Sequence, residues 1–399
     1  MAGLQQGEVP VSQDVSVVGV AMTSMHRRDQ APEAMARQVV AQAMADAGLG
    51  PADIGLVVMA NALGGRLSDQ GCVRGQSWLR GAGLTPAPVV NVDNSCAGGS
   101  SALHLGTLAV RAGQSPVLVV GVEKMWTGDR LGTLAGIEDG LPADERHALH
   151  ARHENSSGSV LMGLNANWVR QQLEDRGTTL DEIAATAVKA RAQGARNPSA
   201  QFRQETTAGE VLGSASVVPP LTRLMCSSFT DGAAAVVLES GASSGAPRVR
   251  ASVLRSGDGE LDYHDRLTET AEQAWKEAGL GPSEVEVVEV HDATSAEELW
   301  ALEALGFFRA GEAGRATVAG HTGYGGAGLY VNPSGGLVAR GHPLGATGLC
   351  QVVELVEQLR GRAGARQRPD TTTAVAVNTG GIMGGRDAGL VAIHVLQRG

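Results

Sequence analysis

One arrangement of residues near the N-terminus recurs far downstream in the same chain. Residues 43–51 read Ala-Met-Ala-Asp-Ala-Gly-Leu-Gly-Pro and precede the apolar run 54–59. Residues 274–282 read Ala-Trp-Lys-Glu-Ala-Gly-Leu-Gly-Pro and precede the apolar run 285–290. In each copy an alanine-rich helical period stops at a glycine, which favours the left-handed backbone that ends helices. Since the apolar run that follows is typical of a buried parallel strand, the chain predicts two copies of one α/β unit.

The neighbours of these segments repeat as well. A strand is predicted before each helix, at 15–22 and at 249–254, and a glycine-rich turn opens a further helix near Cys96 and near His342. Alternating strands and helices of this kind predict parallel or mixed sheets that are covered by helices on both faces. We therefore expect duplicated α/β halves.

The regular alternation is interrupted once. Residues 126–214 hold charged and polar helical stretches, after which residues 230–240 return as an apolar strand that completes the first half. The expected units are a flexible leader at 1–14, an N-terminal half at 15–125 and 215–245, an inserted loop domain at 126–214, and a C-terminal half at 246–399.

Composition excludes several classes of function. The 399 residues are 43% hydrophobic, which is enough for two or three domain-sized units, and no run of about 18 apolar residues predicts a membrane span. A net charge of −10 argues against nucleic acid or anionic membranes as general partners. The polar N-terminus lacks a signal peptide, and the four cysteines are spaced neither as a disulfide framework nor as a zinc site, so a cytoplasmic location is expected.

The turn around Cys96 is the clearest candidate site. Residues 91–100 read Asn-Val-Asp-Asn-Ser-Cys-Ala-Gly-Gly-Ser, between an apolar strand at 88–92 and an alanine- and leucine-rich helix that runs to Gly113. A cysteine at a helix N-terminus can be stabilised as the thiolate, which is the nucleophile, and the same N–H groups can hold an oxyanion. A buried structural cysteine is the alternative, but the strand–turn–helix context favours a nucleophile.

These motifs resemble the thiolase superfamily. The turn Asn-Ser-Cys-Ala-Gly-Gly resembles the nucleophile turn of thiolases, and residues 332–348 resemble their second signature almost throughout. Three further segments resemble the sterol-carrier-protein type of thiolase, at 196–202, 230–235 and 290–295. The resemblance covers about 15–394 and implies a thiolase fold, a five-layer α/β/α/β/α sandwich with an inserted loop domain.

The resemblance also assigns roles. It implies that His342 activates the Cys96 thiol and helps to bind a thioester oxygen, and that His291 lines the oxyanion pocket of the second substrate. An imidazole suits both tasks, although a helix-capping or strand-end histidine is the plain alternative for each. Gly380 is expected to offer a backbone N–H to an oxyanion, and Asn378 and Asn332 are candidate substrate contacts. No metal site is expected.

The chain departs from its relatives at the second catalytic cysteine. Sterol-carrier-type thiolases place it in His-Asp-Cys-Phe, where this chain has Ala293, and other thiolases place it before a glycine pair, where this chain has Asn378. Neither side chain can remove an α-proton. The remaining candidates, Cys96, His291 and His342, resemble the Cys-His-His set of decarboxylating ketosynthases, which need no base to remove an α-proton. We therefore expect slow thiolysis and a preference for synthesis.

The predicted activity is acyl transfer through a Cys96 acyl-enzyme, followed by Claisen-type C–C bond formation with a second substrate. The alternatives are a degradative 3-ketoacyl-CoA thiolase with another base, and a non-catalytic scaffold for a small acyl-CoA-binding partner protein. An acyl-CoA or acyl-carrier-protein thioester is the expected substrate, without a further cofactor. By resemblance, a homodimer or a dimer of dimers is expected to form across the strand 88–92.

Three weaker patterns support no separate function. The glycines of 323–328 match a nucleotide-binding spacing but do not join a strand to a helix, so a turn is favoured. Three histidines within 147–153 fan over about 120° of a helix, which suits one metal ion poorly. A basic stretch is equally consistent with the phosphates of CoA and with a plain charged surface; its members are Lys189, Arg191, Arg196 and Arg203.

Overall fold

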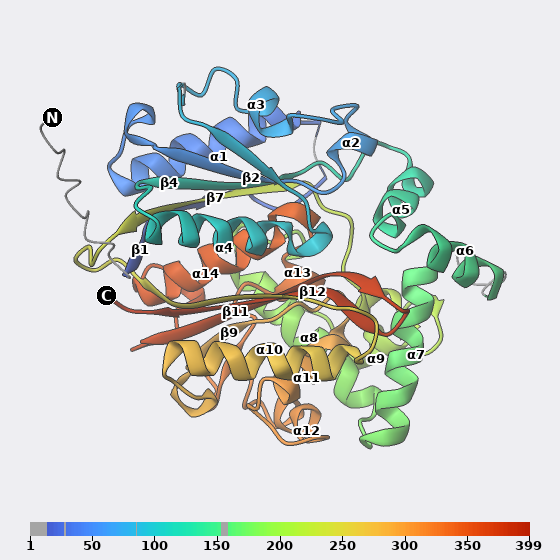
Figure 1. Ribbon diagram of the computed structural model, residues 1–399. Coiled ribbons are helices and arrows are strands. Elements are labelled where there is room, and N and C mark those ends of the chain that lie inside the picture. The colour runs from blue at the N-terminus through green and yellow to red at the C-terminus, as the bar shows by residue number, and fades with distance from the viewer. Residues whose placement is uncertain (1–13, 28, 85, 153–158) are drawn as a thin grey trace, which may run out of the picture.

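The computed structural model describes residues 14–27, 29–84, 86–152 and 159–399. The expected leader at 1–14 therefore lies, except for Asp14, outside the described residues. Figure 1 shows five stacked layers in which two sheets alternate with three layers of helices. The five-layer α/β/α/β/α prediction is confirmed.

The N-terminal sheet has the strand order β3-β2-β4-β7-β1. Its strands are β1 (Val15–Met22), β2 (Leu56–Ala60), β3 (Val89–Val92), β4 (Val117–Glu123) and β7 (Gly232–Ser240). Strand β2 pairs in parallel with β3 and β4, and β7 runs antiparallel to β4 and β1. The apolar run predicted at 230–240 is thus the strand that joins β1 to the parallel part of this sheet.

The C-terminal sheet repeats this topology in the order β10-β9-β11-β12-β8. Its strands are β8 (Arg248–Ser256), β9 (Val287–Glu289), β10 (Tyr330–Val331), β11 (Thr373–Met383) and β12 (Asp387–Gln397). Strand β9 pairs in parallel with β10 and β11, and β12 runs antiparallel to β11 and β8. The sheets meet at one residue pair, Ser16 and Arg248, so each half has its own sheet of the same design.

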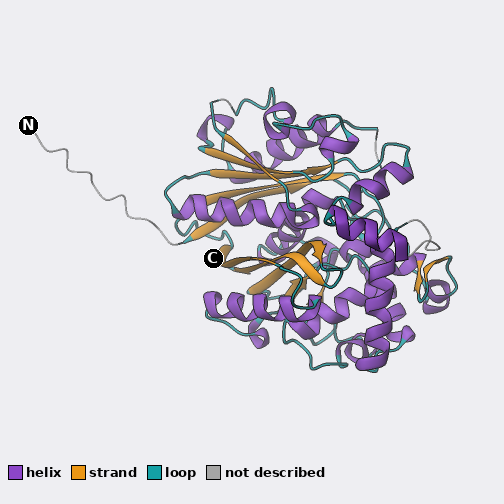
Figure 2. Cartoon of the chain, turned by 45° about the vertical axis from the view of Figure 1, so that its right-hand side comes forward, coloured by secondary structure: helices purple, strands orange, loops and turns teal. Residues whose placement is uncertain are grey.

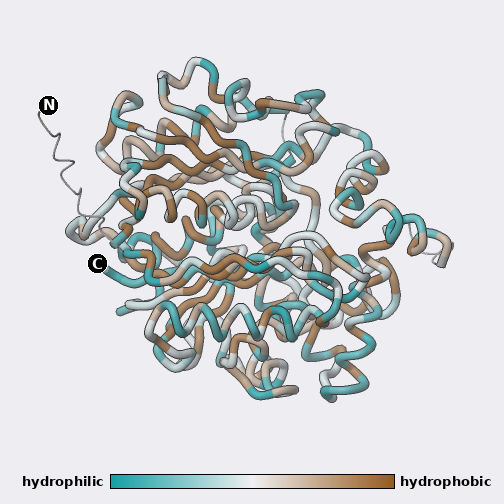
Figure 3. Tube along the Cα trace, viewed as in Figure 1, coloured by the Kyte–Doolittle hydropathy of each residue, from teal (hydrophilic) through white to brown (hydrophobic). Residues whose placement is uncertain are grey.

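Helices α4 (Gly98–Arg111) and α14 (Thr347–Leu359) lie between the sheets, and almost every residue of α14 is buried. Helix α1 (Pro32–Ala47) covers the outer face of the N-terminal sheet, and α10 (Tyr263–Ala278) and α11 (Ser295–Ala304) cover that of the C-terminal sheet. Apolar residues follow the strands of both sheets in Figure 3. Burial of these residues between the layers is the main stabilising term.

The predicted helix ends are confirmed. Helix α1 stops at Gly48 with φ 70°, and α10 stops at Gly279 with φ 68°. A side chain at either position would be strained in this left-handed backbone, which explains why a glycine stands at the same place in both copies.

The segment between β4 and β7 runs along one side of the layers (Figures 1 and 2). Its elements are α5 (Arg130–Glu138), α6 (Ala143–Arg152), α7 (Val160–Asp175), α8 (Leu180–Arg196), α9 (Ala208–Leu212), β5 (Ser216–Val218) and β6 (Leu221–Thr222). The last two strands pair only with each other. We propose the part of this segment at 126–214 as the inserted loop domain, so that β5 and β6 belong to the stretch 215–245 of the N-terminal half.

The remaining helices are short. They are α2 (Gly64–Leu67), α3 (Arg74–Trp78), α12 (Ala313–Val318) and α13 (Gly336–Ala339), with 3-10 turns at Pro51–Asp53, Ser95–Ala97, Arg223–Met225, Pro282–Glu284, Leu344–Ala346 and Gly364–Arg366. None of the described helices combines the length and apolar character that crossing a bilayer requires.

Candidate active site

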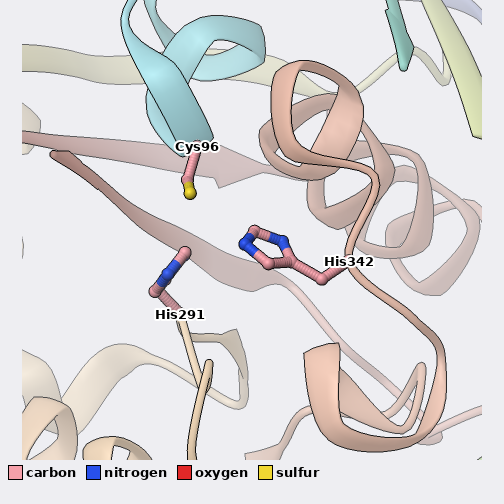
Figure 4. A group of neighbouring side chains, drawn as sticks. All are labelled: Cys96, His291 and His342. Carbon is pink, nitrogen blue, oxygen red and sulfur yellow. The ribbon is translucent and has the colours of Figure 1, made fainter. Parts of the chain in front are cut away.

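Three predicted side chains converge where the two halves meet (Figure 4). Cys96 lies in the 3-10 turn before α4, His291 follows β9, and His342 precedes the 3-10 turn Leu344–Ala346 that leads into α14. The thiol sulfur and one imidazole nitrogen of each histidine all lie within 4.8 Å of one another. The two rings stand edge to face, with their centroids 5.2 Å apart. The N-terminal half therefore supplies the sulfur and the C-terminal half both imidazoles.

Close backbone packing holds the Cys96 turn in place. A Cβ added to Gly380 on β11 would lie 2.4 Å from the carbonyl oxygen of Asn94 and 2.6 Å from the nitrogen of Ala97. No side chain fits there, because such contacts are far inside van der Waals distance. Gly380 therefore lies against the nucleophile turn, and its predicted role as an N–H donor to an oxyanion stays a proposal.

The thiol of Cys96 is protonated at rest. Burial raises the pKa of Cys96 to about 12, and the carboxyls of Glu297 and Glu123 add to this rise. The hydroxyl of Ser95, 3.9 Å from the sulfur, opposes it only in part. The expected thiolate is therefore wrong for the resting enzyme: loss of solvation outweighs the helix terminus, and Cys96 needs a base.

His342 is arranged as that base. Its Nδ1 lies 2.8 Å from the hydroxyl oxygen of Thr347, and this hydroxyl donates its only hydrogen to the carbonyl of Pro343 at 3.0 Å. Nδ1 must then carry the ring proton and donate it to Thr347, which leaves Nε2 as an acceptor. Burial, His291 and Arg340 lower the pKa of His342 well below its usual value, so the ring is neutral before reaction.

His291 has the opposite tautomer. The amide nitrogen of Asn378 lies 2.9 Å from its Nδ1, while the hydroxyl of Ser100 donates to the other atom of that amide, Oδ1, at 3.4 Å. Nδ1 therefore accepts a hydrogen bond, and Nε2 carries the proton. Burial, with the charge of Arg340, lowers the pKa of His291 to about 3. A neutral imidazole with Nε2–H is a donor for a substrate oxygen.

The two asparagines contribute differently from what we predicted. Asn378 and Asn332 are fully buried and do not line the cavity described below. The side-chain oxygen of Asn332 accepts from the Val290 amide at 2.8 Å, and its nitrogen donates to Glu298 at 3.0 Å. Because their polar atoms are already engaged within the protein, they position His291 and are not substrate contacts in this arrangement.

Glu123, which the sequence did not single out, joins the loop after β2 to the His342 turn. This buried carboxylate at the end of β4 accepts hydrogen bonds from the amides of Ala62 and Leu63 at 2.9 and 3.1 Å. It also accepts one from the amide of Gly345 at 2.9 Å, which fixes the His342 turn against the N-terminal half. Burial raises the pKa of Glu123 to about 7. The only signal in the sequence was a charged residue ending an apolar strand.

A cavity of about 710 Å³ opens above the three catalytic groups. Most of its wall is apolar, with aromatic side chains from Trp168, Phe202, Phe229 and Tyr263. Four arginines also line it, namely Arg27, Arg130, Arg191 and Arg223. Within the described part of the chain none of the four forms an ion pair with a carboxylate. The cavity thus combines apolar walls with unpaired positive charge.

Among the described residues, the weaker sequence patterns do not form a second centre. In the basic stretch only Arg191 lines the cavity; Lys189 pairs with Glu298, and Arg196 lies over the ring of Tyr324. Residues 323–328 form turns between α12 and β10, which confirms that they do not join a strand to a helix. In the histidine cluster, His150 lies 2.9 Å from Glu138, and position 153 falls outside the described residues.

Two family models match the chain over most of its length. The model described as "Thiolase, N-terminal domain" covers residues 15–217, and that described as "Thiolase C-terminal domain-like" covers residues 260–391. Acetyl-CoA acetyltransferase of Methanothermobacter thermautotrophicus is 35% identical over 96% of this chain and 100% of its own length. Sterol carrier protein 2 of Bos taurus is 32% identical over 94% of this chain and 72% of its own length.

A third relative is the benzoylsuccinyl-CoA thiolase subunit BbsB of Thauera aromatica, which is 32% identical over 78% of this chain and 81% of its own length. Among solved structures, the Ltp2-ChsH2(DUF35) aldolase matches with a TM-score of 0.80 and 21% identity, over 97% of this chain and 98% of that chain. This last match supports the fold alone.

Proposed function

This chain belongs to the thiolase family and is an acyltransferase, and we propose that it carries its acyl group on Cys96. The observation behind the proposal is the convergence of one thiol and two neutral imidazoles of opposite tautomer within 4.8 Å at the base of a cavity. Cys96, His291 and His342 are the proposed catalytic residues. As for thiolases generally, CoA enters as a substrate, and no separate cofactor is needed.

The first half-reaction uses His342 as base and acid. Nε2 of His342 accepts the Cys96 proton as the sulfur attacks the carbonyl carbon of the thioester. The negative charge that develops on the carbonyl oxygen is stabilised by hydrogen-bond donors, for which we propose the Gly380 amide. When the thioester bond breaks, the leaving thiolate takes the proton from His342, which leaves an acylated Cys96 and a neutral imidazole.

The cavity supports an apolar acyl group carried by CoA or by a carrier-protein arm. Its apolar wall favours an aliphatic or aromatic acyl chain larger than acetyl. The four unpaired arginines are suited to the phosphates of either carrier, because guanidinium groups bind phosphate through paired hydrogen bonds.

We propose C–C bond formation as the second half-reaction. His291, through its Nε2–H, would hold the thioester oxygen of the second substrate while the α-carbon attacks the acyl group on Cys96. Degradative thiolysis runs the same steps in reverse and is the alternative. The third reading, a non-catalytic scaffold, is disfavoured because the three catalytic groups are in place.

We also propose the assembly and location expected from the sequence. A homodimer or dimer of dimers fits the exposed Val90 on the edge strand β3 and the exposed Leu105 and Leu108 on α4. A small acyl-CoA-binding partner protein is consistent with the second component, ChsH2(DUF35), in the name of the structural neighbour. A cytoplasmic location follows from the reduced cysteines and stays a prediction.

The test is acylation of the protein by a panel of acyl-CoA thioesters, followed by intact-mass measurement and peptide mapping. We expect one acyl group on Cys96 and none in Cys96→Ser. Cys226 is a matched control, because it lines the same cavity and burial raises its pKa to about 12 as well. A label on Cys226, Cys72 or Cys350 with none on Cys96 would sink the proposal.

A further inference from the structure

The C–C bond step needs a group that removes a proton from the α-carbon of the second substrate. Both positions where a thiol was sought are occupied by side chains that do not titrate, Ala293 and Asn378. The amide of Asn378 is also bound to Nδ1 of His291, a cavity-lining residue whose Nε2 carries the ring proton and is therefore a donor. Neither these residues nor His291 can therefore serve as the base.

A carboxyl stands close to the position of the missing thiol. Glu297 follows Ala293 by four residues, in the first turn of α11, and both line the cavity together with Cys96. Glu297 is only 4% exposed. Glu297 stands three residues after Thr294, the N-cap of α11, whose side chain makes no cap hydrogen bond.

We propose that Glu297 is the acid/base residue of the C–C bond step, and that it takes over the work of the missing cysteine. This inference rests on the proposed function. In synthesis Glu297 acts in its ionised form: the α-C–H bond breaks and the proton passes to an oxygen of the Glu297 carboxylate. The α-carbon then bonds to the acyl carbon, the C–S bond to Cys96 breaks, and the proton returns from Glu297 to the sulfur. Thiolysis reverses each step.

The surroundings of Glu297 suit this role. Burial raises the pKa of Glu297 to about 8, and the titratable groups whose pKa values it influences are the neutral Cys96, Cys226 and Tyr263. No lysine or arginine of the described chain forms an ion pair with it, whereas its neighbour Glu298 pairs with Lys189. A carboxyl that changes protonation near neutral pH is matched to taking up and returning a proton.

The plain alternative is that Glu297 only caps α11. Thr294-Ser-Ala-Glu297 has the spacing of a capping box, in which the glutamate accepts a hydrogen bond from the backbone of the first residue. Glutamine fills this position equally well, because its side-chain oxygen accepts the same bond. Glu297→Gln therefore keeps the cap but cannot take up a proton.

Three measurements separate the roles. The first is single-turnover acylation of Cys96 by the acyl-CoA panel, and the second is thiolysis of acetoacetyl-CoA and 3-oxooctanoyl-CoA. The third is deuterium uptake at the α-carbon of acetyl-CoA in D₂O, followed by mass. We expect Glu297→Gln to acylate within about threefold of wild type and to lose about 10²–10⁴-fold in thiolysis and deuterium uptake. Adding Ala293→Cys to that variant should restore at least about tenfold.

The outcomes distinguish this inference from the proposed function. If wild-type Cys96 is not acylated, the proposed function fails, while deuterium uptake still tests Glu297. If Glu297→Gln keeps thiolysis and deuterium uptake within about threefold of wild type, the inference is overturned. It is also overturned if acylation and thiolysis fall together and the Ala293→Cys addition restores nothing, because a structural role alone would give that pattern.

Discussion

Replacing Glu297 with glutamine should stabilise the protein at alkaline pH. The pKa of Glu297 is raised from 4.5 to about 8, so between these values the folded state holds a proton that the unfolded state has lost. Stability contributed by this group therefore falls as pH rises through that window, and glutamine removes the loss. A shift of this size corresponds to an upper limit of about 5 kcal/mol. Because water and side chains relax around a buried charge, we expect Glu297→Gln to raise the free energy of unfolding at alkaline pH by about 1–3 kcal/mol.

The measurement is urea unfolding of wild type and Glu297→Gln at pH 5 and pH 8.5. The gain from glutamine should be small at pH 5 and should grow toward pH 8.5. Glu210 provides a matched control, because it stands at the same position relative to the N-cap of its helix, α9, but is exposed, and hydrogen bonds from Thr207 and Thr206 lower its pKa. Glu210→Gln should not stabilise at either pH. A Glu297→Gln difference that does not change with pH would refute the reasoning.

Two further predictions concern acylation and assembly. Thr347→Val removes the acceptor of the His342 Nδ1–H, so Nε2 is no longer fixed as the base. Single-turnover acylation of Cys96 should therefore slow by about 10–100-fold. An unchanged rate would contradict the tautomer assigned to His342. Wild type should sediment as a dimer or dimer of dimers, and Val90→Asp on the exposed edge of β3 should shift it toward monomer; a wild type that is monomeric at micromolar concentration would rule this out.

Local patterns were enough to predict the duplicated α/β halves, whereas the five-layer sandwich followed from the resemblance to thiolases. The repeated helix end, glycine and apolar run indicated two equal halves, because helix caps and buried strands depend mainly on residues close in the sequence. The same holds for Cys96, His291 and His342, each of which lies in a turn beside a strand or helix. Resemblance to thiolases then placed these turns at one site.

The chemistry of the site was harder to predict, since it depends on contacts between distant residues. The tautomer of His291 follows from Asn378, and the His342 turn is fixed by Glu123 through Gly345, 222 positions away. The pKa of Cys96 was predicted in the wrong direction, because the sequence shows the helix that follows but not how completely the thiol is buried.

The expectation of slow thiolysis likewise left out residues that only the fold brings into the cavity. It assumed that only a thiol at position 293 or 378 could handle the α-proton, since no sequence pattern indicated that Glu297 and Cys96 line the same cavity. In the first turn of α11 its spacing from Thr294 reads as an ordinary cap. With Glu297 in the cavity, very slow cleavage becomes the expectation for Glu297→Gln, and the wild type is expected to run the C–C step in either direction.

Burial of the site gives the catalytic groups a common resting state. It raises the pKa of Cys96 and Glu297 and lowers those of His291 and His342, so at neutral pH the thiol and both imidazoles are uncharged and Glu297 is largely so. Charge then develops only when the thioester reacts. The two histidines have separate tasks, because Nε2 of His342 accepts the thiol proton and Nε2–H of His291 donates to a substrate oxygen. A more solvated site would ionise Glu297 at rest, and this carboxylate would oppose formation of the Cys96 thiolate beside it.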